Sequence, residues 1–178
     1  MKITKLAADE IHSLRSQLSD LLIDVVDGGA AVSFLAPMPR DAADAFWQGV
    51  ADDIAKGTRT VLVAVIDDRV VGCVHLALAM QPNGRHRAEV QKLLVHSRYR
   101  RRGVATALMT AAEAEAQGMG RSLLVLDTES GSLGEQLYMQ LGYQRAGVIP
   151  HFARSSNGNM HATVVFYKQL KVGNGQAS

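Results

Sequence analysis

The sequence concentrates positive charge in one short segment near the middle of the chain. Seven of the nineteen lysines and arginines lie between Arg85 and Arg102, and that segment contains a single acid, Glu89. Outside it, the totals of 19 basic and 17 acidic residues fall to 12 and 16, a balance of −4. A mildly acidic chain with one basic segment indicates a local binding site for an anion.

The basic segment ends in a turn between two predicted elements. Residues 88–95 (AEVQKLLV) are typical of a strand, and the small and apolar residues of 104–117 predict a helix. The first backbone N–H groups of a helix lack intrahelical partners and attract anions, most closely where a residue such as Gly103 leaves room for a phosphate. Two alternatives are a solvated basic turn and a contact with nucleic acid. The second is disfavoured because Tyr99 alone is available to stack on bases.

The rest of the pattern predicts the elements that position this turn. Helices come first, an antiparallel meander follows, and strands then alternate with helices, which together imply an α+β fold with a mixed sheet. The predicted strands are 2–6, 58–66, 69–80, 88–95, 122–127, 144–149 and 163–170, and the predicted helices are 9–28, 41–56, 104–117 and 133–141. We expect Asp9 to cap the first helix and Asp67-Asp68 to form a hairpin turn.

Length and composition indicate a single domain over residues 1–170, followed by a flexible tail, 171–178. The 178 residues are 47% hydrophobic and 20% charged, as in ordinary globular proteins. No apolar run approaches the roughly 20 residues of a membrane span, and the N-terminus does not resemble a secretory signal, so we expect a cytoplasmic protein without membrane contact. We predict no metal site, because the six histidines lack the paired spacing of metal ligands and Cys73 is the single cysteine.

The turn and its flanks resemble the acetyl-CoA motif of the GNAT superfamily of N-acetyltransferases. The resemblance rests on the spacing Arg100-x-x-Gly103-x-Ala105 behind Leu93-Leu94-Val95, and the order of elements matches from about Lys2 to Leu170. It implies a mostly antiparallel sheet that splays between two strands and is flanked by helices. It also implies acetyl-CoA as co-substrate, with its pantetheine arm on the main chain of Leu93 and Val95. The implied pyrophosphate site is the main chain of Arg100, Arg101, Arg102, Gly103, Val104 and Ala105.

A second family signature follows in Leu137-Tyr138-x-x-Leu141-Gly142-Tyr143. The resemblance implies that Tyr138 is the general acid, and a phenol with a pKa of about 10 can protonate the departing CoA thiolate. The plainer interpretation is a tyrosine that packs on an amphipathic helix. One departure is Gly131, where many members carry an asparagine that contacts CoA. Ser130 or Ser132 must replace that contact, or it is absent.

Two acids are candidates for handling the acceptor amine, which must lose a proton before it attacks. Glu89 begins the strand before the turn, and Asp127 ends the next strand. The resemblance implies that these strands are neighbours that splay apart around the thioester, so both acids are expected to face the cleft. We predict Glu89 as the base, directly or through water, and Asp127 as the anchor of the amine. The alternatives are an ion pair of Glu89 with Arg87 or Lys92, and a helix-capping role for Asp127.

The phrases GGAAVSF, QPNGRHRAEVQKLLV and LDTESGS…YMQLGY are similar to the tabtoxin-resistance acetyltransferases, which inactivate a β-lactam amino-acid toxin. This implies transfer of acetyl to a primary amine of a small molecule, with such a toxin as the candidate acceptor, by direct attack in a ternary complex. The alternatives are a protein or peptide N-acetyltransferase on the same fold, and a CoA-binding module without catalysis. We expect a monomer or homodimer that does not bind nucleic acid.

Overall fold

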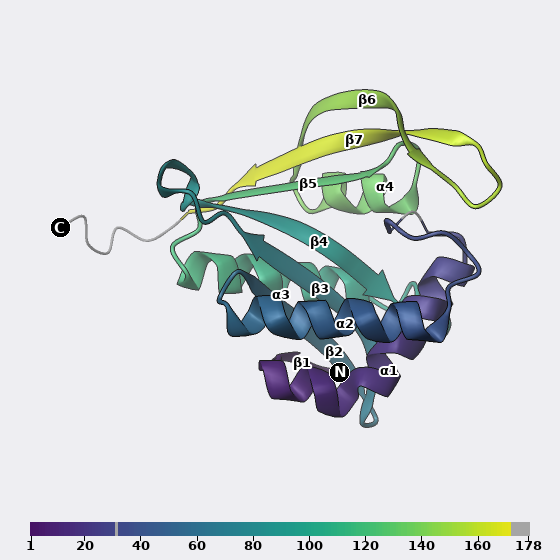
Figure 1. The fold of residues 1–178 in the computed structure, drawn as a ribbon. Helices are drawn as coiled ribbons and strands as arrows, with labels where there is room; N and C mark the ends of the chain where they lie inside the picture. The colour runs from purple at the N-terminus through teal and green to yellow at the C-terminus, as the bar shows by residue number, and fades with distance from the viewer. Residues whose placement is uncertain (31, 172–178) are drawn as a thin grey trace.

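A seven-stranded mixed sheet organises the chain, as seen in a computed structural model that describes residues 1–30 and 32–171 (Figure 1). The strand order is β1-β2-β3-β4-β5-β7-β6; β4 and β5 pair in parallel, and the other neighbours are antiparallel. The strands are β1 (Lys2–Lys5), β2 (Arg59–Ile66), β3 (Arg69–Leu78), β4 (Arg87–Val95), β5 (Leu123–Glu129), β6 (Gln144–Arg154) and β7 (Met160–Gln169). The helices are α1 (Ala8–Asp27), α2 (Arg40–Ala55), α3 (Val104–Gly118) and α4 (Leu133–Gln140). The predicted α+β fold is confirmed; of the predicted tail, residues 172–178 lie outside the described ranges.

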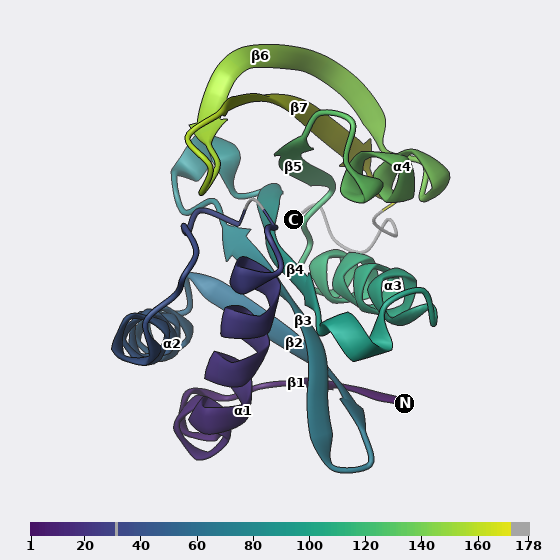
Figure 2. The ribbon, with the colours of Figure 1, turned by 90° about the vertical axis from the view of Figure 1, so that its right-hand side faces the viewer.

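Helices cover both faces of the sheet (Figure 2). Helices α1 and α2 share one core with the sheet, in which Ile11, Leu18 and Trp47 are fully buried. Helix α3 forms a second core on the other face, where Leu108 and Met109 pack against the strands. No helix among residues 1–30 and 32–171 is long and apolar enough to cross a membrane.

Three predicted boundaries are wrong for identifiable physical reasons. Helix α1 is capped at Ala7, whose N–H donates to the Glu10 carboxylate at 2.8 Å, so Asp9 lies inside the first turn. Strand β5 runs past Asp127 to Glu129 because its last residues still pair with β7. Strand β6 continues to Arg154 because its pairing with β7 resumes beyond an irregularity after Ile149. The hairpin turn at Asp67-Asp68 is confirmed, with φ of 48° and 57°.

The sheet splays between β4 and β5. Arg87–Glu89 of β4 pair with Leu123–Val125 of β5. Beyond these residues the two strands diverge, as Figure 1 shows. At the same level β4 bulges: its register with β3 shifts between Gln91 and Leu94, and Lys92 has φ of 49°. The bulge and the splay together open the sheet just before the basic turn.

Candidate active site

Two cavities meet at the splay. We call the first the inner pocket; it has a volume of about 470 Å³ and lies between the loop 32–35, the middle of β4, β5 and the β6–β7 hairpin. We call the second the groove; it has a volume of about 750 Å³ and runs along the end of β4, the basic turn, the start of α3 and α4. Among the residues that the structure describes, five line both cavities: Val32, Leu93, Thr128, Glu129 and Tyr138. A molecule in the groove can therefore meet a molecule in the inner pocket beside Tyr138.

The groove contains most of the residues predicted to hold the cofactor. Its lining includes Leu93, Val95, Arg100, Arg101, Gly103, Val104, Ala105 and Ser132. Arg102 is not part of that lining; its guanidinium carbon lies 5.6 Å from the centroid of the Tyr99 ring.

The backbone of the basic turn leaves the start of α3 open to an anion. Arg101 and Gly103 both have left-handed φ, of 59° and 76°. Gly103 is the N-cap and provides no side-chain hydrogen bond to the helix. The first N–H groups of α3 are therefore available to a ligand in the groove. The Nε of Arg100 donates to Val95 O at 3.3 Å, which ties the turn to the end of β4.

Ser132 lies in the groove beside Gly131, the position where the family's asparagine is missing. Its hydroxyl caps α4 by accepting from Glu135 N at 3.2 Å, and it lies 3.3 Å from Thr128 Oγ1. Gly131 has φ of 79° and donates its N–H to the Glu135 carboxylate at 2.7 Å. Of the two serines predicted as replacements, Ser132 lies in the groove and Ser130 lines neither cavity.

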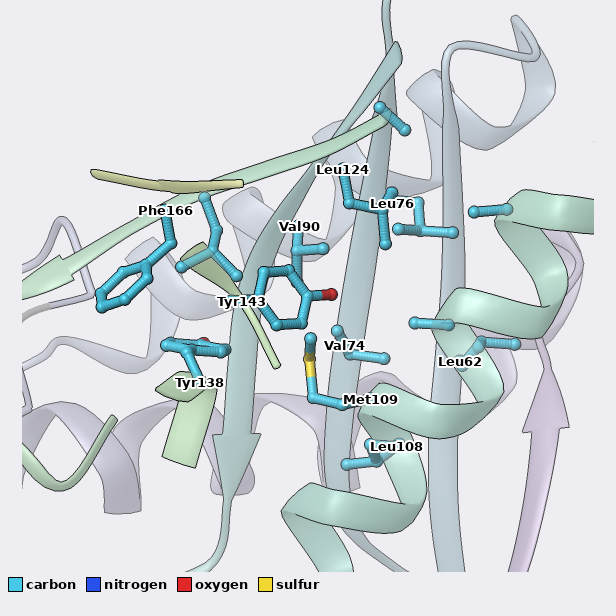
Figure 3. Close-up of a cluster of buried hydrophobic side chains, with 14 of the residues drawn as sticks. Leu62, Val74, Leu76, Val90, Leu108, Met109, Leu124, Tyr138, Tyr143 and Phe166 are labelled. Carbon is cyan, nitrogen blue, oxygen red and sulfur yellow. The ribbon is translucent and has the colours of Figure 1, made fainter. Parts of the chain in front are cut away.

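Tyr138 is packed and also borders both cavities. Its side chain is only 7% exposed, with ring centroids 5.7 Å from Tyr143 and 6.2 Å from Phe166 (Figure 3). Burial, and then the negative charge of Asp127, raise the pKa of Tyr138 well above its usual value. The phenol therefore keeps its proton throughout the neutral range. The packing and the donor interpretations of this tyrosine are compatible.

Glu89 and Asp127 both line the inner pocket. Glu89 pairs with Val125 across β4 and β5, and Asp127 lies two residues beyond Val125, so the two acids share one face of the sheet. Glu89 forms no ion pair with Arg87 or Lys92 among the residues described. Asp127 does not cap a helix; its carboxylate accepts from Thr163 Oγ1 at 2.7 Å.

Two residues in this region were not singled out from the sequence. Asp24, at the end of α1, accepts hydrogen bonds from Ser97 in the basic turn. The two residues are 73 positions apart, so no local sequence pattern predicts this contact. Lys92 enters the inner pocket from the β4 bulge. A lysine within the apolar run 88–95 was a visible signal, but a regular strand would have placed it on the same face as Val90.

Cys73 and His75 are ionisable groups that lie in the core, away from the two cavities. Within residues 1–30 and 32–171, no three histidine, cysteine or acidic side chains gather as metal ligands would. Burial raises the pKa of the Cys73 thiol to about 12, so it remains a thiol in the core. His75 is fully buried against the Phe46 and Trp47 rings, with centroids 6.1 and 5.4 Å away.

Comparison with known proteins identifies the family and the fold of the chain. Residues 31–143 match the acetyltransferase (GNAT) family. The fold is similar to that of a ribosomal-protein-alanine N-acetyltransferase from Brucella melitensis, with TM-score 0.78 and 19% identity, covering 96% of this chain and 100% of that one. It is similar to yncA from Salmonella typhimurium, solved with its cofactor acetyl-CoA (TM-score 0.77, 18% identity, coverage 100% and 99%). An aminoglycoside 6′-acetyltransferase type Ii gives TM-score 0.70 at 23% identity, with coverage of 95% and 97%.

The chain belongs to the GNAT family of acetyltransferases. It is therefore an acyltransferase by family, and the structure of its neighbour yncA contains acetyl-CoA.

Proposed function

We propose that this enzyme transfers acetyl from acetyl-CoA to the primary amine of a small molecule, by direct attack in a ternary complex. The observation that carries the proposal is the meeting of the two cavities at Tyr138 and Leu93. The groove offers an anion site and an elongated binding surface. The inner pocket presents Glu89 and Asp127 to an amine, while its third acid, Glu129, pairs with His161 at 2.9 Å.

In this proposal the groove positions the cofactor. The pyrophosphate lies on the N–H groups from Arg100 to Ala105, and the pantetheine arm follows the main chain of Leu93 and Val95. These contacts direct the thioester toward the junction beside Tyr138. Positioning of this kind contributes much of the acceleration in a two-substrate reaction, because it replaces a bimolecular encounter.

The acids and the phenol then handle the protons. Asp127 holds the acceptor as its ammonium, and Glu89 takes one ammonium proton, directly or through water. The free amine forms the C–N bond to the acetyl carbonyl carbon, and the tetrahedral intermediate collapses by breaking the C–S bond. Tyr138 gives its proton to the departing thiolate, and the proton that the nitrogen must still lose restores the phenol through solvent.

The acceptor class separates this proposal from its alternatives. The similarity to the tabtoxin-resistance enzymes supports a β-lactam amino acid as the acceptor. The lining of the inner pocket also includes the aromatic rings of Phe34 and Phe152. One structural neighbour is named for a protein acceptor and another for an aminoglycoside, so both classes belong in the test.

The test is a panel of amines scored by release of free CoA. It contains β-lactam amino acids, simple amino acids, aminoglycosides and a peptide with an N-terminal alanine. We expect turnover of small amines and none of the peptide. Turnover of the peptide alone would favour the protein acetyltransferase, and acetyl-CoA binding without any turnover would favour the inactive module.

A further inference from the structure

The inner pocket contains one ammonium group whose position depends on the β4 bulge. Ala88 and Val90, before the bulge, belong to the core under α3, whereas Leu94, after it, belongs to the core under α1 and α2. Lys92 lies at this change of face with φ of 49°, a conformation that non-glycine residues rarely adopt. The backbone is therefore held in a costly geometry at the residue that brings this ammonium to the pocket.

The contacts of Lys92 are neutral. Its Nζ donates to Val32 O at 2.9 Å and to Ser33 Oγ at 3.1 Å. It also lies 5.6 Å from the Phe34 ring centroid and 6.0 Å from that of Phe46. An ammonium has three N–H donors, so these two hydrogen bonds leave one donor for another partner.

No carboxylate of the described ranges lies within 4 Å of Lys92 Nζ. Burial, and then the charge of Arg59, lower the pKa of Lys92, while Asp127 and Glu89 offset this from a longer distance. Removing an ammonium from water without a paired anion is unfavourable, and a bound anion relieves that cost. A second cation in the lining, Arg154, contacts Gly158 O at 3.3 Å.

We propose that Lys92 binds a carboxylate of the acceptor, so that the inner pocket selects molecules carrying both a primary amine and a carboxylate. The amine lies at Glu89 and Asp127, and the carboxylate takes the third N–H of Lys92, with Arg154 adding positive charge on the β6 side. This inference rests on the proposed function, since it assigns the second half of the same acceptor. It concerns binding and orientation, and it assigns Lys92 no proton transfer.

A purely structural role for Lys92 is the competing explanation, because its hydrogen bonds hold the loop 32–34 against the pocket. The two roles predict different selectivity. If Lys92 only holds the loop, its loss affects every acceptor alike. If it binds a carboxylate, its loss affects acceptors that carry one.

The experiment compares acceptors that differ only in the carboxylate: L-lysine with cadaverine, and L-ornithine with putrescine. Wild type, Lys92→Met and Lys92→Arg are assayed by release of free CoA. Met keeps the approximate length of the side chain and, like Lys, carries a Cβ at this left-handed backbone position. Arg keeps the positive charge. Ser33→Ala is the matched control, since it removes one loop contact and leaves the ammonium.

We expect wild type to prefer each amino acid over its amine by at least tenfold in kcat/KM. Lys92→Met should lose about 10- to 100-fold for the amino acids, mostly through KM, as expected for a lost hydrogen bond to a charged group. The amines should change less than threefold, Lys92→Arg should keep the preference, and acetyl-CoA affinity should be unchanged. Ser33→Ala should leave selectivity intact.

Equal turnover of amino acids and amines by wild type overturns the carboxylate site and leaves the proposed function standing. An equal loss for both in Lys92→Met has the same meaning and assigns Lys92 to the loop. Turnover of other amines in the panel but of neither member of these pairs also overturns the carboxylate site. Absence of turnover with every amine of the panel contradicts the proposed function itself.

Discussion

The carboxylate of Asp24 accepts two hydrogen bonds from Ser97, one from the backbone N–H and one from the hydroxyl, each at 2.7 Å. Ser97 begins the basic turn, and Asp24 lies in the last turn of α1. The His96 ring is also close, with Nδ1 3.5 Å from the same carboxylate. The shape of the basic turn therefore depends on a helix near the start of the sequence.

Asp24→Ala should weaken acetyl-CoA binding by about tenfold or more while the protein remains folded. Each hydrogen bond to a charged group contributes about 1.5–3 kcal/mol, and their loss leaves the turn to be ordered by the ligand. Calorimetric titration with acetyl-CoA measures the change, and Ser97→Ala, which keeps the backbone hydrogen bond, should show a smaller one. Tighter binding by Asp24→Ala would mean that the repulsion between Asp24 and the pyrophosphate outweighs these hydrogen bonds.

Gly103→Glu should weaken acetyl-CoA binding more than Gly103→Gln does. Both substitutions place a side chain at φ of 76°, which costs about 1–2 kcal/mol in either variant. They differ in the carboxylate, which repels a pyrophosphate on the first turn of α3. Calorimetry gives the affinities, and thermal unfolding checks that both variants lose similar stability. Equal affinities for the two variants would locate the phosphates elsewhere.

The sequence predicted the parts of this molecule that depend on local pattern. The strand predicted over residues 88–95 is present, with the alternation of side chains between two faces that any strand has. The turn and helix around Gly103 indicated an anion site. It did not predict the consequences of pairing between distant segments. The β4 bulge brings Lys92 to the pocket by interrupting that alternation, and neither it nor the contact of Asp24 with Ser97 has a local signature.

The stability of the protein should fall in acid because of His75. Burial, followed by the charges of Arg59 and Lys92, lowers the pKa of His75 well below 6.5. Below pH 6.5 the unfolded chain therefore binds a proton that the native state does not bind, and unfolding becomes more favourable. The contribution of neutral His75 to the free energy of unfolding is complete above pH 6.5. It is lost as the pH falls toward the native pKa, at about 1.4 kcal/mol per pH unit.

Urea unfolding of wild type and His75→Gln between pH 7.5 and 5 tests this effect. The variant should be less stable at pH 7.5, since it loses the stacking on Phe46 and the edge-on contact with Trp47. Its stability should nevertheless decline less steeply below pH 6.5. Parallel curves for the two proteins would show that His75 is not the group responsible.

Glu89→Gln should lower kcat/KM most at pH values well below the pKa of the acceptor amine, which is about 10 for a simple primary amine. In that range the amine arrives protonated, so a base in the inner pocket must remove the proton. Gln keeps the size of the side chain and removes its basicity. A pH–rate profile of free-CoA release measures the effect, and a loss of equal size at every pH would exclude Glu89 as the base.

Tyr138→Phe should cut turnover by about 10²–10⁴-fold, the usual range for a lost general acid, with little change in acetyl-CoA affinity. The substitution removes only the hydroxyl, and the ring contacts with Tyr143 and Phe166 are kept. Because burial raises the pKa of Tyr138, its proton is present at every pH of the assay, so the loss should be the same from pH 6 to 9.

A loss of turnover that does not vary with pH distinguishes Tyr138 from Glu89, whose substitution should have a pH-dependent effect. Tyr143→Phe is the matched control, since its ring belongs to the same core and Tyr143 lines neither cavity. Thiols have pKa values of about 8.5, so the thiolate leaves without protonation at a reduced rate, and some activity should remain. Turnover of Tyr138→Phe within threefold of wild type, with chemistry shown to be rate-limiting, would make Tyr138 a packing residue and leave the thiolate to be protonated by water.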